Sequence, residues 1–110
     1  MDIELLKPKL LRFWSHSRAL TFIGHLKNKE YHLSFSRFTG IKTLTRLSRK
    51  NPFTLLVEKT IEQGDYELLL VHKDQILVLK PGTNHIEPGH YRLRLIGDHA
   101  NGNLSIKSII

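Results

Sequence analysis

The side chains with the clearest chemical potential are the arginines and lysines, which could neutralise the phosphates of a nucleic acid. The 110 residues include 17 Lys and Arg against 10 Asp and Glu, a formal net charge of +7 with neutral histidine. Residues 1–50 contain eleven basic and three acidic residues, and no acid occurs between Glu30 and Glu58. Concentrated positive charge attracts polyanions and raises their encounter rate. We therefore expect a phosphate-binding surface in the first half of the chain.

Residues 39–50 hold the sharpest local pattern in this basic half. At about 100° per residue, Ile41, Leu44 and Leu47 share one face of a helix, and Pro52 prevents its continuation. A strand would mix apolar and basic residues on the same side, so the spacing favours a short basic helix near 41–50. Its opposite face would carry Lys42, Arg46, Arg49 and Lys50.

The predicted phosphate contacts combine this basic face with Arg37 and with a neighbouring hairpin tip. Tyr31 and Phe38, at strand ends, are candidates for stacking on unpaired bases, because most other rings fall at core positions. DNA and RNA stay undetermined, since nothing in the pattern would sense a 2′-hydroxyl. The predicted nucleic-acid-binding residues are Lys27, Lys29, Arg37, Lys42, Arg46, Arg49, Lys50, Tyr31 and Phe38.

The seven histidines raise the question of a metal site. The compact cluster is His85, Glu87 and His90, which offers two imidazoles and a carboxylate, a ligand set used for iron and zinc. Residues 81–85 resemble a cupin loop, but the second ligand strand and its spacing are missing. We therefore interpret these side chains as exposed loop polars, and we expect no metal and no other cofactor.

Catalytic motifs are absent from the sequence. It has no G-x-S-x-G elbow, no Walker loop, no G-x-G-x-x-G and no H-E-x-x-H, and no cysteine that could act as a nucleophile. The prediction is a binding protein without catalytic residues, not an enzyme.

Short runs of β-forming residues must position these side chains. Gly, Pro and Asn separate the runs at intervals of about 8–12 residues, which is typical of antiparallel β structure. We expect a single domain over 1–110, mainly β, forming a compact barrel or sandwich of about six or seven strands with an N-terminal helix. That helix either spans 2–16 with a kink at Pro8 or is shorter, with Pro8 near its first turn. Polar turns are expected at 63–65 and 97–103, with a loop over 81–89. The predicted strands are 19–26, 31–38, 53–61, 66–71, 75–80, 90–96 and 104–110. Of these, 19–26 and 31–38 are expected to form one hairpin, in which His25 could face His32, and 66–71 and 75–80 a second one.

The last predicted strand, 104–110, supports an alternative function. It is apolar with one charged residue, Lys107, and as an open edge it could pair with a second copy or with a protein partner. The protein would then be an interaction or assembly protein, such as an adaptor, an inhibitor, or a viral or phage structural subunit. For the strand itself, we favour closure of the protein's own sheet.

The start of the chain bears on its location. It is acidic and lacks the basic segment of a signal peptide, and uninterrupted apolar runs such as residues 68–71 are far short of a membrane span. We therefore expect a cytoplasmic protein without membrane association.

Overall fold

The computed structural model describes residues 3–11, 16–27 and 30–109, which form one helix and seven strands in one antiparallel sheet. The strand order is β1-β3-β7-β4-β5, with β2 also paired to β3 and β6 also paired to β4. The prediction of a mostly antiparallel β protein with an N-terminal helix is therefore confirmed. Within the described residues, no helix is long and apolar enough to cross a membrane. The elements are α1 (Ile3–Leu10), β1 (Ser17–Arg18), β2 (Thr21–Lys27), β3 (Glu30–Arg49), β4 (Phe53–His72), β5 (Gln75–Leu79), β6 (Gly82–Ile86) and β7 (Gly89–Ile109).

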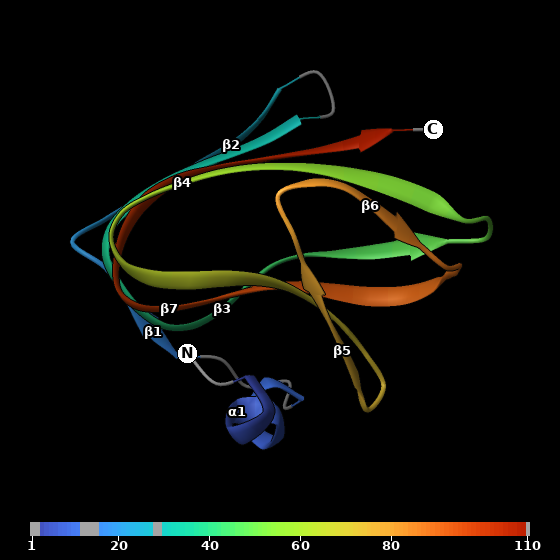
Figure 1. Ribbon diagram of the computed structural model, residues 1–110, viewed down its shortest axis with the longest axis horizontal. Coiled ribbons are helices and arrows are strands. Elements are labelled where there is room, and N and C mark those ends of the chain that lie inside the picture. The colour runs from blue at the N-terminus through green and yellow to red at the C-terminus, as the bar shows by residue number, and fades with distance from the viewer. Residues whose placement is uncertain (1–2, 12–15, 28–29, 110) are drawn as a thin grey trace.

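Three long strands, β3, β4 and β7, bend back on themselves and fold the sheet into two layers (Figure 1). Residues 30–35 of β3 pair with 102–107 of β7 in the upper layer, and 40–49 pair with 89–97 in the lower layer. β4 follows the other side of β7 through the same two layers. β2 and β6 extend the upper layer, and β1 and β5 extend the lower one. The molecule is a sandwich made from a single bent sheet.

The bends coincide with interruptions of the strand register. The ladder shifts between Phe35 and Gly40 in β3 and between Ile61 and Asp65 in β4. Extra residues at such shifts bend and twist a strand. Gly64 has a φ of +72°, which glycine adopts without steric cost. The turns expected at 63–65 and 97–103 are therefore wrong, because both segments are bends inside continuous strands.

The main core lies between the two layers. Alternate residues of the long strands point into this core. Within it, the rings of Phe35 and Tyr66 pack edge to face, with their centroids 4.9 Å apart. The buried members are Leu33, Phe35, Phe38, Phe53, Leu55, Val57, Tyr66, Leu68, Leu70, Leu79, Ile86, Leu93, Leu95, Ala100, Leu104 and Ile106.

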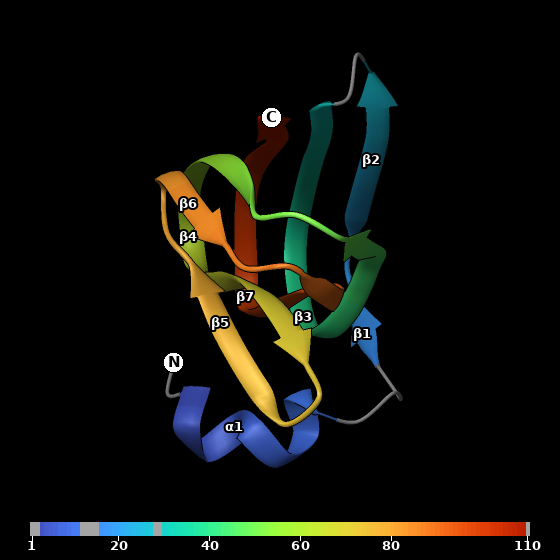
Figure 2. The same cartoon turned by 90° about the vertical axis from the view of Figure 1, so that its right-hand side faces the viewer.

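Helix α1 covers a second, smaller apolar cluster on the outer face of the lower layer (Figure 2). Ile3, Leu6 and Leu10 pack there against Leu69 and Ile96. Their spacing is the helical spacing seen in the sequence, so this part of the predicted helix is confirmed, with Pro8 inside it. The rest of the predicted 2–16 helix includes residues 12–15, which lie outside the described residues.

The segment 41–50 is not a helix, because residues up to Arg49 form the second half of β3. Thr43 pairs with Arg94 of β7 and Thr45 pairs with Leu93, so Leu44 is the extra residue of a β-bulge. A bulge shifts the inward–outward alternation by one residue. Leu44 contacts the main core, whereas Ile41 contacts the cluster beneath α1. Ile41, Leu44 and Leu47 therefore all contact one of the two apolar clusters, and their three-residue spacing resembles that of an amphipathic helix.

Two further predictions concern the connections and the last strand. The expected loop over 81–89 contains β6, which pairs with Phe53 to Val57 of β4. Residues 104–109 belong to β7, with β3 on one side and β4 on the other. Leu104, for example, pairs with both Leu33 and Lys59. Closure of the protein's own sheet is confirmed, and the idea that this strand is an open edge is wrong.

Tyr66 connects β4 and β7 near their bends through its hydroxyl group, and we expect it to make the stability of the protein depend on pH. Its buried hydroxyl donates to the carbonyl oxygens of Thr60 at 2.9 Å and Asn103 at 3.1 Å, and burial raises the pKa of Tyr66 to about 12 from 10.0. The unfolded chain ionises first, so the stability that Tyr66 contributes is complete below pH 10 and is lost as the pH rises toward 12. Urea unfolding of the wild type and Tyr66→Phe should show their difference in unfolding free energy shrinking over that range. A constant difference would contradict the assignment.

Candidate anion-binding groove

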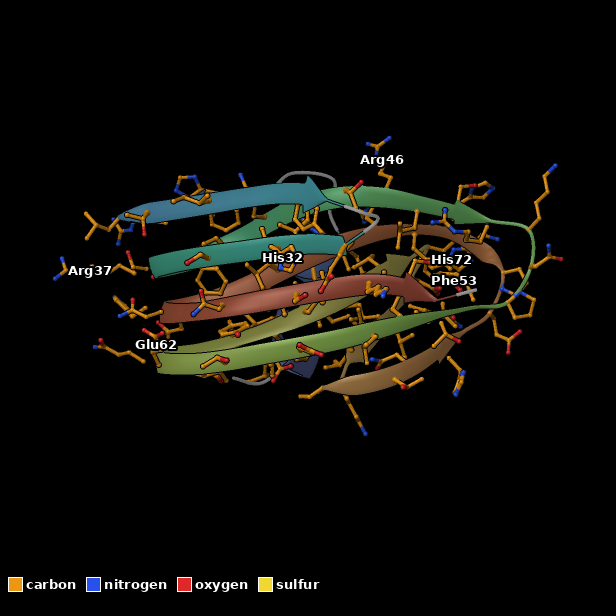
Figure 3. All side chains as sticks on the ribbon, turned by 90° about the horizontal axis from the view of Figure 1, so that it is seen from above. His32, Arg37, Arg46, Phe53, Glu62 and His72 are labelled. Carbon is orange, nitrogen blue, oxygen red and sulfur yellow. The ribbon has the colours of Figure 1, made fainter. Side chains whose placement is uncertain are left out.

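The structure separates the basic residues that the sequence grouped together. Figure 3 shows Arg37 at one end of the molecule and Arg46 well away from it, on the upper margin of the view. Arg37 is exposed at the bend of β3, and Arg46, Arg49 and Lys50 are exposed toward the end of that strand and just beyond it. Lys42 is half-buried, and its ammonium group lies 5.1 Å from the centroid of the Phe22 ring. The common basic face predicted for residues 42–50 does not exist, because the bulge turns Lys42 and Arg46 to opposite sides of the sheet.

The predicted stacking rings are also not presented to solvent as expected. Phe38 is only 1% exposed and belongs to the main core, so its prediction as a base-stacking residue is wrong. The sequence predicts a strand that ends at Phe38. In the structure β3 continues past Phe38 through the bend, and the Phe38 ring is covered. Tyr31 is half-buried and packs against the same core. The Lys27 side chain and Lys29 lie outside the described residues.

One groove gathers cationic side chains from both halves of the chain. It has a volume of about 690 Å³ and lies beside Leu11, where α1 ends. Its walls come from the last part of β3, the first part of β7 and the β4–β5 turn. None of its described lining residues is acidic. The polar lining residues are Arg46, Ser48, His72, Lys73, His90 and Arg92. We call this site the Arg46–Arg92 groove.

Arg46 and Arg92 face each other directly across the β3–β7 ladder. Side chains in such pairs lie close together, and like charges in them are destabilising. Burial, and after it the charge of Arg46, lowers the pKa of Arg92. An anion between the two guanidinium groups would relieve this repulsion, and paired arginine forks suit the oxygen atoms of a phosphate.

Helix α1 holds the arginines of β7 in place. Arg92 donates from Nη2 to the carbonyl oxygen of Leu11 at 2.8 Å, and the buried Arg94 donates from Nη1 to that of Leu10 at 2.7 Å. These carbonyls lie at the C-terminal end of α1, where the helix carries partial negative charge. The position of Arg92 in the groove is therefore set by the end of the helix.

Ser48 and the histidines add hydrogen-bonding groups to the groove. Ser48 and His90 are opposite each other in the ladder, and the Ser48 hydroxyl lies 2.6 Å from Nδ1 of His90. His72 donates from Nδ1 to the carbonyl oxygen of His90 at 2.7 Å. Hydroxyl and imidazole groups beside two arginines can complete the contacts to a phosphate oxygen.

The histidine cluster considered for a metal is not assembled. His85 is exposed on β6 with Nδ1 3.2 Å from the Thr54 hydroxyl, whereas His90 pairs with Ser48. In the part of the chain that the structure describes, no group of three or more His, Asp or Glu could hold a metal ion.

The sequence points to Arg46 but not to Arg92, Lys73 or His72, and it places His90 in a possible metal cluster instead. Residues 51–110 hold six basic against seven acidic residues, and this balance hides a local cluster of basic residues. The alternation of Arg92 and Arg94 with Leu93 and Leu95 was the available signal. It places both arginines on one face of a strand, but only the sheet shows that Arg46 lies opposite.

Comparisons with known proteins add little. No protein-family model matches the chain, and no curated protein matches its sequence. One similar solved structure is a cupin superfamily protein from Desulfitobacterium hafniense DCB-2, with 21% identity, 90% of this chain and 81% of that chain covered, and a TM-score of 0.36. Another is the Drosophila melanogaster CENP-C cupin domain, with 11% identity, 96% and 95% covered, and a TM-score of 0.31. Likenesses at this level carry no argument about this chain.

Proposed function

We propose that the protein binds nucleic acid without catalysing a reaction, and that it holds a backbone phosphate in the Arg46–Arg92 groove. The main support is the cross-strand arginine pair in a groove without an acidic side chain among its described lining residues. The net charge of +7 supports the same proposal, because it raises the encounter rate with a polyanion.

The surroundings of the groove suit a polymer better than an isolated phosphate ion. Arg49 and Lys50 are exposed and follow Arg46 along the chain, and Lys73 lies on the wall formed by the β4–β5 turn. The guanidinium of Arg49 lies 5.6 Å from the centroid of the Phe53 ring, which holds it at the surface. A nucleic acid strand that crosses the groove could thus contact cationic side chains on both sides of the central phosphate.

A fluorescence anisotropy titration tests the proposal. The probes are a single-stranded DNA, the corresponding duplex and a single-stranded RNA, each titrated at several salt concentrations. We expect a dissociation constant below about 100 μM at low salt, weakening steeply as salt is added, because phosphate contacts release counterions. No measurable binding of any of the three probes at low salt would overturn the proposal.

Charge reversal at Arg46 should weaken nucleic acid binding about tenfold or more, since it puts a carboxylate opposite Arg92 and removes a cation that neutralises phosphate. The slope of log affinity against log salt should fall by about 1, because the variant neutralises one phosphate fewer. Arg37→Glu is the matched control, because Arg37 is also cationic and exposed but lies at the bend of β3, away from the groove. Both variants should keep the wild-type stability within about 0.5 kcal/mol. An equal or larger weakening by Arg37→Glu would place the site elsewhere.

A further inference from the structure

β2 is an open edge of the upper layer. It pairs with β3 along one side, and no other described strand lies against its second side. Figure 2 shows β2 at the margin of the molecule. Exposed edges are templates for another strand, and proteins usually protect them with charges, prolines or bulges. β2 has no proline, its one charged residue is Lys27 at its end, and its register with β3 is unbroken.

Apolar side chains accompany this edge. Leu20 is 68% exposed and Ile23 is 64% exposed. Ile23 also borders a groove of about 640 Å³ on the outer face of the upper layer, where Glu58 and Lys59 contribute one charge of each sign. An added strand would cover both apolar side chains and pair the open backbone groups of β2.

The charges near β2 indicate what kind of strand fits. A hollow of about 300 Å³ beside the start of β2 is lined by Arg18, Leu20 and Arg37, and both arginines are exposed. His99 also lines this hollow, and the carboxylate of its chain neighbour Asp98 lies 2.7 Å from Nδ1 of the His99 ring. A second copy of the chain would bring its own net charge of +7 to this edge, which opposes self-association. An extended segment with acidic residues complements it.

We propose that β2 receives an extended segment of a partner protein as an additional strand. Apolar side chains of that segment would cover Leu20 and Ile23, and acidic ones would lie beside Arg18 and Arg37. Backbone hydrogen bonds supply affinity in this mode of recognition, and the flanking side chains supply specificity. The surface runs along β2 to Arg18 and Arg37 near the bend, and the hollow there shares no lining residue with the Arg46–Arg92 groove.

The test uses a fluorescent peptide of alternating Val and Thr with two Asp at one end, and a matched peptide with two Lys instead. The full chain should bind the acidic peptide at least about tenfold more tightly, and the peptide should slow amide exchange in β2. Ile23→Lys should weaken this binding about tenfold, because lysine on an edge opposes strand addition. Leu77→Lys is the control, since Leu77 is 43% exposed on β5 at the other margin of the sheet. Arg18→Glu should reverse the preference between the two peptides.

Several outcomes would overturn the proposal. Equal binding of the two peptides, or equal weakening by Leu77→Lys, would show that β2 is not the receptor. A dimer seen by light scattering without peptide, and absent in Ile23→Lys, would make a second copy the occupant. The two proposals also fail separately: Arg46→Glu should leave peptide binding unchanged, and Ile23→Lys should leave nucleic acid binding unchanged.

Discussion

Replacing Gly97 with alanine should destabilise the protein by about 1–3 kcal/mol, the usual cost of overpacking a core. An ideal Cβ at Gly97 would lie 2.4 Å from Cδ1 of Phe38 and 3.2 Å from its carbonyl oxygen. The Phe38 ring is buried and lies 5.6 Å, centroid to centroid, from the rings of both Phe22 and Phe35. It therefore has little room to move aside, and the bend itself must yield.

Urea unfolding of Gly97→Ala and wild type measures this cost, and a double-mutant cycle tests its cause. Phe38→Ala removes Cδ1 and Cε1, the ring atoms that the new methyl group meets. The cost of Gly97→Ala should therefore be smaller in the Phe38→Ala background than in the wild type, a coupling expected for residues in contact. Strict additivity of the two changes would show that the strain arises somewhere other than at Phe38.

Leu10→Ala should release helix α1 from the sheet. The Leu10 side chain is fully buried between α1 and the sheet. Truncation of a buried leucine to alanine lowers the free energy of unfolding by about 2–5 kcal/mol. The eight residues of α1 are too few for a helix that is stable without packing. Hydrogen exchange should show the amides of residues 3–10 losing protection while those of β7 keep theirs. Nucleic acid affinity should fall as well, because Arg92 loses the Leu11 carbonyl that orients it.

Leu5→Ala provides the matched control for this prediction. Leu5 lies on the same helix but is 79% exposed, so its truncation should change stability by no more than about 0.5 kcal/mol. If Leu10→Ala instead lowered protection equally throughout the sheet, α1 would be part of the same cooperative unit as the main core.

The features that the sequence predicts well are local ones. The hairpin of β2 and β3 follows from alternating residues on both sides of a short polar segment, and His25 pairs with His32 as that alternation requires. The hairpin of β4 and β5, closed by the pair His72 and Gln75, has the same origin. In both cases the partners are near in sequence, so the pattern of one short segment is enough.

The long bent strands depend on partners far away in the chain. Gly64 in β4 and the polar residues 97–103 in β7 look like turns in the sequence. The pairing of Gly102 with both Phe35 and Ile61 shows that β7 continues through its segment, and the pairing of Asp65 with Asp98 shows that β4 continues past Gly64. For the same reason, the sequence predicts only part of the candidate site. Arg46 is evident from its own segment, whereas its pairing with Arg92 follows from the register of the whole sheet.

The central place of β7 has a consequence for how the chain folds during synthesis. β7 separates β3 from β4 and supplies the main ladder to each, yet it is the last strand to be translated. Until residues 89–109 follow, the nascent chain can form hairpins but cannot close either layer, so apolar residues such as Leu33 and Leu55 stay uncovered. Folding that waits for such distant pairings is slow and exposed to aggregation. We therefore expect translation products that stop before β7 to bind chaperones or aggregate rather than accumulate as a smaller sandwich.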